Sequence, residues 1–370
     1  MPANPLKHDA VEIVVGGVAH QGWENYDIES DLMTPADAWS VTLAQTEIKL
    51  PANVKPGAPV LVRVGGQTVL SGAIDERSHK VSKGSHTLQM SGRDDAGVLL
   101  DCSAPIFTRQ KLTIAEIVAS VVRPLGIIKH NISAENLLLR EKVSVEPGDT
   151  AWDVLKNAAE ANGLWPWLEP DGTLTVGGPD YTAPVVARLV MRYDGVGNNI
   201  EDVTEKVSQA GLHSEITVLG QAHAVGSNDG KHNIKGGAKN PAVQGYRPKT
   251  ITDHEAINTQ IADAKAAKLL SDERVKGYDL ALLVKGHRTP EGLLYKPGQR
   301  IEVLCEPLGI DGVYFLMARR FSGNRGKGQV THLTLREDGV WALYAHPKTR
   351  KHRRGKNALP LKSLTVGGAP

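Results

Sequence analysis

Cysteine is scarce in this chain, and long apolar runs are missing. The 370 residues contain only Cys102 and Cys305, which lie far apart. Such a spacing implies neither a disulfide framework nor a thiolate zinc site, so we expect two reduced core residues. The opening residues MPANPLKHDA lack the apolar segment of a signal peptide, and no run is long enough to cross a bilayer. The sequence therefore predicts neither secretion nor membrane insertion.

Catalytic motifs are also missing. The chain contains no GxSxG, HExxH, GxxxxGK[ST] or strand-to-helix GxGxxG pattern. The stretch GSNDGKH at 226–232 is one residue short of a phosphate-binding loop and lacks the following Ser or Thr, which favours a plain loop. A wall-degrading enzyme would need a pair of acids in a cleft, and no such pair can be identified. We expect no enzymatic activity and no cofactor.

Metal-ligand spacing is absent among the thirteen histidines. The nearest pairs are His79 with His86 and His346 with His352, and neither has the spacing of a ligand set. We therefore expect no metal site.

An acidic cluster follows Arg93 and consists of Asp94, Asp95 and Asp101. These carboxylates could hold a metal or act as general acids. Turn capping and an ion pair with Arg93 are the favoured interpretation, because short acidic side chains commonly cap turns.

Aromatic residues form only 5% of the chain, whereas glycine and proline number 38 and 21. This composition predicts many turns joining short strands. The net charge of +2 conceals a basic tail at 346–356; without its six basic residues, 37 cations face 41 acids. A slightly acidic body argues against a body-wide nucleic-acid surface and leaves the tail either solvated or a contact arm. The basic residues of the tail are Lys348, Arg350, Lys351, Arg353, Arg354 and Lys356.

Alternating apolar residues predict two β-rich parts. About six short strands are expected between residues 11 and 101, with a hairpin across Gly65-Gly66. Further strands are expected at 216–219, 280–284, 300–305, 313–321 and 329–336, with a loop at 226–240. A helix at 252–276, opened by Thr252 and ended by Gly277, interrupts the second part.

Between these parts, the stretch Pro147 to Gly178 reads as a helix followed by a hairpin. Thr150 and Asp153 form a capping pair, and Gly163 ends the helix. Pro166 cannot donate to a ladder, which predicts an edge strand. A similar helix at 111–127 begins with the capping pair of Thr113 and Glu116, and the run 140–145 is expected to be extended.

The predicted fold is mainly β with α+β parts: two similar small β-barrel domains, a small α/β domain and an inserted helix. We assign residues 8–102 to the first barrel, 103–180 to the α/β domain, 181–225 with 278–345 to the second barrel, and 346–370 to the tail. Residues 226–277 form an inserted loop and helix that packs with the α/β domain.

Three stretches carry a resemblance: SGRDDAGVLLDCSA at 91–104, the helix-hairpin, and 284–341 with VKGHRTPEGLLYKPGQRIEVL and GVYFLMARRFSGNRGKGQVTHLTL. Their succession resembles the baseplate hub proteins of contractile-tailed phages, most closely that of phage Mu and more distantly those of P2 and T4. The resemblance implies a homotrimer whose six barrels form a pseudo-sixfold ring. Such a ring would join the sixfold tail tube to the central spike and enclose the channel through which DNA is ejected.

The same resemblance implies the partners and the location. We expect contacts with the spike as a separate polypeptide, with the tail tube and with other baseplate proteins, whereas DNA is only in transit. The protein would be made in the host cytoplasm and would reside in the tail baseplate of the virion. The basic tail is a candidate contact with the spike.

Taken alone, the helix-hairpin resembles a peptidoglycan-binding LysM module through its GDTxW pattern at 148–152. The alternative function is therefore an adaptor that binds the host cell wall through residues 148–176. A LysM module returns through a second helix, whereas this helix runs directly into a predicted hairpin. Binding to purified sacculi separates the two hypotheses.

Overall fold

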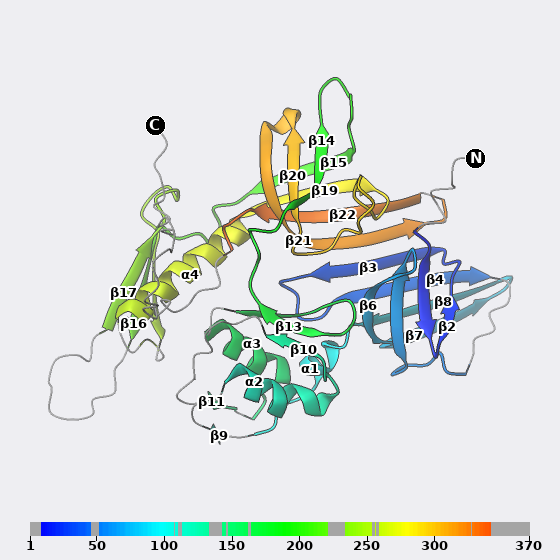
Figure 1. Ribbon diagram of the computed structural model, residues 1–370, viewed down its shortest axis with the longest axis horizontal. Coiled ribbons are helices and arrows are strands. Elements are labelled where there is room, and N and C mark those ends of the chain that lie inside the picture. Colours follow the sequence, from blue (N-terminus) through cyan, green and yellow to red (C-terminus); the bar gives the residue numbers. More distant parts are fainter. Residues whose placement is uncertain are drawn as a thin grey trace, which may run out of the picture.

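The computed structural model describes most of the chain, and strands dominate it (Figure 1). This confirms the predicted mainly-β class. Within the described part, no helix is long and apolar enough to cross a membrane. The described residues are 9–45, 52–106, 108–109, 113–132, 143–145, 147–161, 164–220, 234–253, 256, 259–326 and 328–341.

The first β unit contains eight described strands where about six were predicted. The hairpin across Gly65-Gly66 is confirmed, and both glycines have positive φ, which the turn requires. The sequence pattern does not reveal strand β7, because every one of its residues is exposed and its sequence shows no apolar alternation. The strands are β1 (Val11–Val15), β2 (Val18–His20), β3 (Asn25–Asp31), β4 (Ala38–Gln45), β5 (Pro59–Val64), β6 (Gln67–Ala73), β7 (Glu76–Ser82) and β8 (Ser85–Arg93).

The second β unit confirms the four late strands of the sequence pattern and extends them. Strand β21 is the longest of the described strands, and a bulge between Leu316 and Ala318 shifts its register against β22. The strands are β14 (Val185–Met191), β15 (Ile200–Val207), β19 (Tyr278–Lys285), β20 (Arg300–Cys305), β21 (Ile310–Asn324) and β22 (Gly328–Glu337), with a short 3-10 turn at Glu306–Leu308.

The two β units share one sheet and one core. The strand order is β15-β19-β22-β21-β3-β4-β8-β7, with β20 attached to β21 and β14 to β20. The units meet where β3 pairs antiparallel with β21, so that Ile28 lies opposite Phe321. A side chain at Gly323 would overlap the Tyr26 ring, so glycine allows the close pairing. In the described residues the sheets are open paths, and closure of each unit into a barrel stays a prediction.

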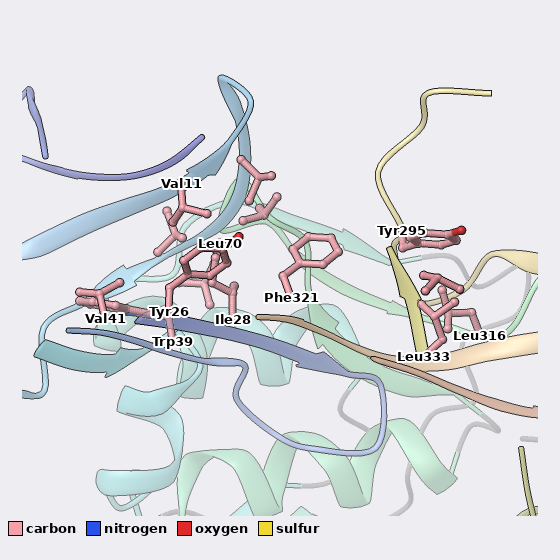
Figure 2. Packing of buried hydrophobic residues seen from close by; sticks show 14 of the residues in the cluster. Val11, Tyr26, Ile28, Trp39, Val41, Leu70, Tyr295, Leu316, Phe321 and Leu333 are labelled. Carbon is pink, nitrogen blue, oxygen red and sulfur yellow. The ribbon is translucent and has the colours of Figure 1, made fainter. Parts of the chain in front are cut away.

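One hydrophobic cluster contains buried residues from the strands of both units (Figure 2). It includes Trp39 and Ile28 from the first unit and Phe321 and Leu333 from the second, each at most 2% exposed. Cys305 belongs to this cluster and is free, whereas the free Cys102 is only half-buried. Because the buried face runs through the β3–β21 pair, we infer that the two units fold as one cooperative body.

The α/β unit confirms the helix-hairpin. Strands β12 and β13 pair antiparallel, and β12, which contains Pro166, lies at the edge of its sheet as predicted. The capping box of Thr113 and Glu116 is also confirmed, but its helix soon changes to π and 3-10 turns. Gly163 and residues 140–142 lie outside the described residues, and the rest of the run 140–145 contains a short strand, as predicted. The elements are α1 (Gly97–Asp101), β9 (Thr108–Arg109), α2 (Ile114–Ile117), a π turn (Val118–Val122), a 3-10 turn (Arg123–Leu125), β10 (His130–Ile132), β11 (Val143–Ser144), α3 (Ala151–Ala161), β12 (Trp165–Leu168) and β13 (Leu174–Gly177).

The inserted part differs from the prediction. Strand β16 (Glu215–Gly220) does not join the second β unit; it pairs with β17 (Ile234–Lys239) and β18 (Pro248–Asp253). Helix α4 (Thr259–Gly277) packs on this small sheet, away from the α/β unit (Figure 1). The physical reason is local burial: Ile216 and Val218 lie against Ala262 and Ala266 of the helix. The predicted packing of the inserted helix against the α/β domain is therefore wrong for most of α4. Of its residues, only Val275 near its end joins a buried cluster that contains Trp165.

The start of α4 was also predicted too early. Thr252 lies in β18, and the helix begins at Thr259, although it ends at Gly277 as predicted. The described part of the expected loop at 226–240 contains β17. Gly236 in this strand allows α4 to lie close, because any side chain at this position would meet Ala262. Residues 221–233, which include the GSNDGKH stretch, lie outside the description.

Helix α3 is capped as its sequence predicts, which gives a direct test. The Thr150 hydroxyl oxygen accepts a hydrogen bond from the Asp153 amide at 3.1 Å and donates to the Asp153 carboxylate at 2.7 Å. We expect Thr150→Ala to lower the free energy of unfolding by about 1 kcal/mol, because one amide of the first turn loses its acceptor. Urea denaturation of Thr150→Ser is the control. That variant keeps the cap, and an equal loss in both variants would contradict the assignment.

Candidate functional site at the junction of the two β units

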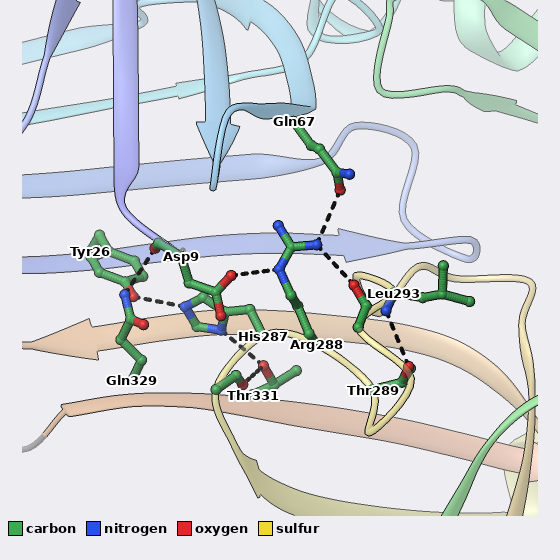
Figure 3. A network of polar contacts seen from close by, with 11 residues as sticks. Asp9, Tyr26, Gln67, His287, Arg288, Thr289, Leu293, Gln329 and Thr331 are labelled. Carbon is green, nitrogen blue, oxygen red and sulfur yellow. Dashed lines mark hydrogen bonds and ion pairs between the residues drawn. The ribbon is translucent and has the colours of Figure 1, made fainter. Parts of the chain in front are cut away.

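A buried polar network pins the two units together where β3 meets β21 (Figure 3). Thr331 donates its hydroxyl to the Gly286 carbonyl at 2.6 Å, so its oxygen accepts from His287 Nδ1 at 3.0 Å. The other nitrogen, Nε2, lies 2.7 Å from the Tyr26 hydroxyl, which must then donate to it. These bonds assign one tautomer to His287 and connect the first unit with the second.

The network is built to stay neutral. Burial lowers the pKa of His287 to about 4, and burial likewise raises the pKa of the Tyr26 hydroxyl above its usual value. The His287 ring also packs against Phe321, with centroids 4.5 Å apart. A neutral, fully enclosed imidazole cannot exchange protons with a substrate, so its role is to hold the junction together.

A second contact ties the segment before β1 to the loop after β19. Arg288 Nε donates to the Asp9 carboxylate at 2.7 Å, and Gln329 donates its side-chain amide to the Asp9 carbonyl at 3.0 Å (Figure 3). The Arg288 guanidinium also reaches the Gly292 carbonyl at 3.0 Å. Because both partners of the ion pair are mostly buried, removal of either one would leave a poorly solvated charge without its partner, which destabilises the fold.

Arg319 is the most deeply buried cation of the junction. Its guanidinium donates to the Ile28 carbonyl at 2.8 Å and lies 4.1 Å above the Phe321 ring. Burial lowers its pKa to about 10, so it stays charged at neutral pH. Burial raises the pKa of the neighbouring Asp37 to about 6, although Arg319 acts to lower it.

Arg319 and Asp37 line a cleft of about 520 Å³ between the two β units and the β12–β13 hairpin. Asp37 and Asp94 both line it, so the structure does contain a pair of acids that sequence inspection missed. Asp37 accepts from the Asp31 amide at 3.0 Å, and Asp94 accepts from the Ala96 amide at 2.9 Å. Both acids thus stabilise turns, and their burial indicates a structural role. The aromatic walls of the cleft include Trp167, Tyr295, Phe315 and Trp341.

The acidic cluster after Arg93 does not converge on one point. Arg93 pairs with Asp101 at 2.6 Å, Asp94 caps a turn, and the side chain of Asp95 accepts from the Ser71 hydroxyl at 3.4 Å. The preferred interpretation, turn capping with an ion pair, is confirmed.

The remaining candidate residues are the two histidine pairs and the basic tail. The rings of His79 and His86 are 5.9 Å apart on adjacent strands. Across the described ranges, no group of three His, Cys, Asp or Glu side chains could hold a metal. The pair His346 and His352 lies in residues 342–370, outside the description. So do the six basic residues of the tail, namely Lys348, Arg350, Lys351, Arg353, Arg354 and Lys356.

Comparison with known protein families agrees with this architecture along most of the described chain, apart from residues 179–212. Residues 10–94 match the N-terminal domain of the Mu phage baseplate assembly protein GpP-like family, and 96–178 match the second domain of the baseplate hub protein gp44-like family. Residues 213–270 match the third domain of NMB1110-like tail proteins, and 272–340 match their C-terminal domain.

Solved structures and a curated relative agree. The tail protein of Neisseria meningitidis MC58 is 38% identical, with a TM-score of 0.80 over 91% of this chain and 99% of that one. The 43 kDa tail protein of prophage MuSo2 from Shewanella oneidensis shares the fold at 20% identity, with a TM-score of 0.78 over 89% and 98% of the two chains. The baseplate hub protein gp44 of Escherichia phage Mu is 22% identical over 84% of this chain and 83% of its own length.

The fold and these matches define a phage tail protein. The chain belongs to the family of Mu-like baseplate hub tail proteins.

The LysM-like stretch falls inside this assignment. Residues 148–176 lie wholly within the range that matches a hub domain. Trp152 and Leu174 are buried in the α/β core, together with residues of α1 and α2. These observations favour the hub over a wall-binding adaptor, and a pull-down with purified sacculi, in which the hub should stay unbound, tests the alternative.

Proposed function

We propose that this protein is the structural hub subunit of a contractile-tail baseplate. Three copies would form a pseudo-sixfold ring that joins the tail tube to the central spike and encloses the DNA ejection channel. The observation that carries this proposal is the single sheet formed by two four-stranded halves, β15-β19-β22-β21 and β3-β4-β8-β7. Two similar halves per copy are what a threefold ring needs in order to match a sixfold tube.

The proposed domain division follows the same halves. The first β unit within residues 8–102 and the second, from 181 onward without the insertion, would each complete a small barrel in the ring. The α/β domain at 103–180 and the inserted sheet with α4 would lie outside it. The matched family ranges have boundaries near residues 95, 178, 213 and 271, which supports the limits proposed for the α/β domain and for the insertion.

Ring closure would use the two ends of the strand path. Within the described residues, β7 and β15 each have one side without a partner strand. Exposed strand edges present unpaired amide and carbonyl groups that another chain can pair with. Contact of β15 in one copy with β7 in the next would continue the sheet around the ring and would close both ends of this strand path.

The proposed channel wall is the polar face of the sheet, on the side away from the core. Its cations are neutralised within the chain: Arg320 lies 2.8 Å from Asp27 and 3.4 Å from Glu29, and Arg336 lies 3.7 Å from Asp279. A wall of hydroxyls and paired charges would not hold phosphates, so DNA could pass. The polar face includes Asp27, Glu29, Ser40, Thr42, Gln89, Ser91, Arg320 and Thr334.

This wall predicts a gain of binding. Asp27→Asn/Glu29→Gln should raise the affinity for duplex DNA several-fold and make it more salt-dependent, because Arg320 becomes available to a phosphate. Fluorescence anisotropy with a labelled duplex at low and moderate salt measures the change. Glu12→Gln/Glu215→Gln changes the net charge equally elsewhere and should have little effect. Tight DNA binding by the unmodified protein would contradict a non-binding wall.

The proposed partners are the spike, the tail tube and other baseplate proteins, in the virion tail. The chain would act without catalysis, as expected of a structural subunit. The basic tail, Lys348 to Lys356, is proposed to contact the spike through complementary charge. If deletion of residues 346–370 leaves spike binding unchanged, this contact is contradicted and the tail is a solvated terminus.

Light scattering on a sizing column tests the assembly state. The hub proposal predicts a mass near three times 39.8 kDa at high protein concentration. A strict monomer at every concentration and salt would contradict self-assembly of the isolated chain.

A further inference from the structure

One turn of the second β unit presents exposed apolar side chains. Between β14 and β15, Tyr193 is 79% and Val196 is 64% exposed, and Leu308 in the adjacent turn is 42% exposed. We call residues 192–199 and 306–309 the knob. It projects beyond β19 and β22, on the side away from β3 (Figure 1). Clustered exposed apolar residues on a projecting turn are typical of an interaction surface.

The knob is held in one shape before any partner arrives. The Asn198 side chain accepts from the Arg192 amide at 2.7 Å, and the Asp194 carboxylate accepts from the Val196 amide at 2.9 Å. Glu306 reaches across from the second turn and accepts from the Tyr193 amide at 2.9 Å. A turn ordered in this way loses little conformational entropy on binding, which favours a role as an anchor.

The opposite end of the strand path offers a complementary surface. Every residue of β7 is exposed, and within the described part of the chain this strand pairs with β8 alone. Val81 on this hairpin is 62% exposed. Strand β7 and the turn after it, residues 76–84, carry Arg77, Lys80 and Lys83 against one acid, Glu76, whereas the knob carries Asp194 and Glu306 against one cation, Arg192. The charges of the two surfaces are therefore opposite in sign.

We propose that the knob of one copy docks on the β7–β8 hairpin of the next copy. This inference rests on the proposed trimer and names its contact surfaces. The knob directly precedes β15, so the contact would continue the edge at which the sheets of two copies meet. A knob at one end and its receptor at the other make a head-to-tail interface, which closes into a ring when the rotation between copies is 120°.

The first test removes the apolar side chains of the knob. Tyr193→Ala/Val196→Ser should need at least a tenfold higher protein concentration for half-assembly in light scattering, as expected for aromatic anchors. Tyr246→Ala is the matched control, because Tyr246 is 80% exposed but lies in the inserted part. Circular dichroism and thermal unfolding verify that both variants remain folded.

The second test places the contact directly. Val196→Cys/Val81→Cys should form linked dimers and trimers under mild oxidation, whereas each single variant should not. If the unmodified protein is a trimer but the knob variant assembles equally well and no links form, the inference fails while the hub proposal stands. If the unmodified protein never exceeds a monomer, the self-assembly on which both rest is overturned.

Discussion

Replacing Arg319 with methionine is expected to lower the free energy of unfolding by about 3–5 kcal/mol. The substitution removes the cation beside Asp37 and leaves the Ile28 carbonyl, now 2.8 Å from the guanidinium, without that donor. It also removes the contact with the Phe321 ring. Urea unfolding at pH 7.5 measures the loss.

The neighbouring residue provides the control. Arg320 has the same chemistry but points to the polar face, where its side chain is 48% exposed and pairs with Asp27. Arg320→Met should cost less than about 1 kcal/mol. Equal losses from the two variants would contradict the assignment of Arg319 as the buried pin of the junction.

The Arg319→Met loss should also depend on pH. The folded-state pKa of Asp37 is raised, so protonation of this carboxyl favours the folded state and its contribution increases as the pH falls from about 6 toward 4. Without Arg319, the carboxylate becomes still more costly to bury. The loss should therefore be smaller at pH 5 than at pH 7.5.

Acidification should weaken the junction through His287, and this is the second large effect. Its folded-state pKa is about 4, below the unfolded value of 6.5. The unfolded chain therefore binds the proton first, and stability is lost as the pH falls below 6.5. Between pH 7.5 and pH 5 this linkage lowers the free energy of unfolding by about 2 kcal/mol. At pH 5 the solution is about 1.5 units below the unfolded pKa, and each unit contributes about 1.4 kcal/mol.

A pair of variants isolates this contribution. His287→Gln removes the titrating group, so its stability should change by about 2 kcal/mol less than that of the unmodified protein over the same pH range. His332→Gln, an exposed histidine on β22, should keep the full dependence. If all three proteins respond to pH equally, His287 is not the buried neutral group described above.

Local signals predicted much of the fold. The capping pairs at Thr113 and Thr150, the hairpin at Gly65-Gly66 and the edge strand with Pro166 each depend on residues within a few positions. Such patterns act through short-range sterics and hydrogen bonds, so the sequence can reveal them without knowledge of the rest of the chain.

The junction could not be predicted in the same way. Ile28 and Phe321 pair although they are far apart in the sequence, and no local pattern encodes their pairing. Arg319 reaches the core because the bulge after Leu316 shifts the register of β21, which strand alternation does not reveal. His287 lies in a stretch that supported the family resemblance, but its burial depends on Tyr26 and Thr331.

The central claim is that three copies close into a ring around an open channel, and electron microscopy of the purified assembly tests it most directly. We expect end-on class averages with threefold symmetry, six similar inner lobes and a hole at the centre. A particle with a filled centre, or an assembly with twofold symmetry, would contradict it.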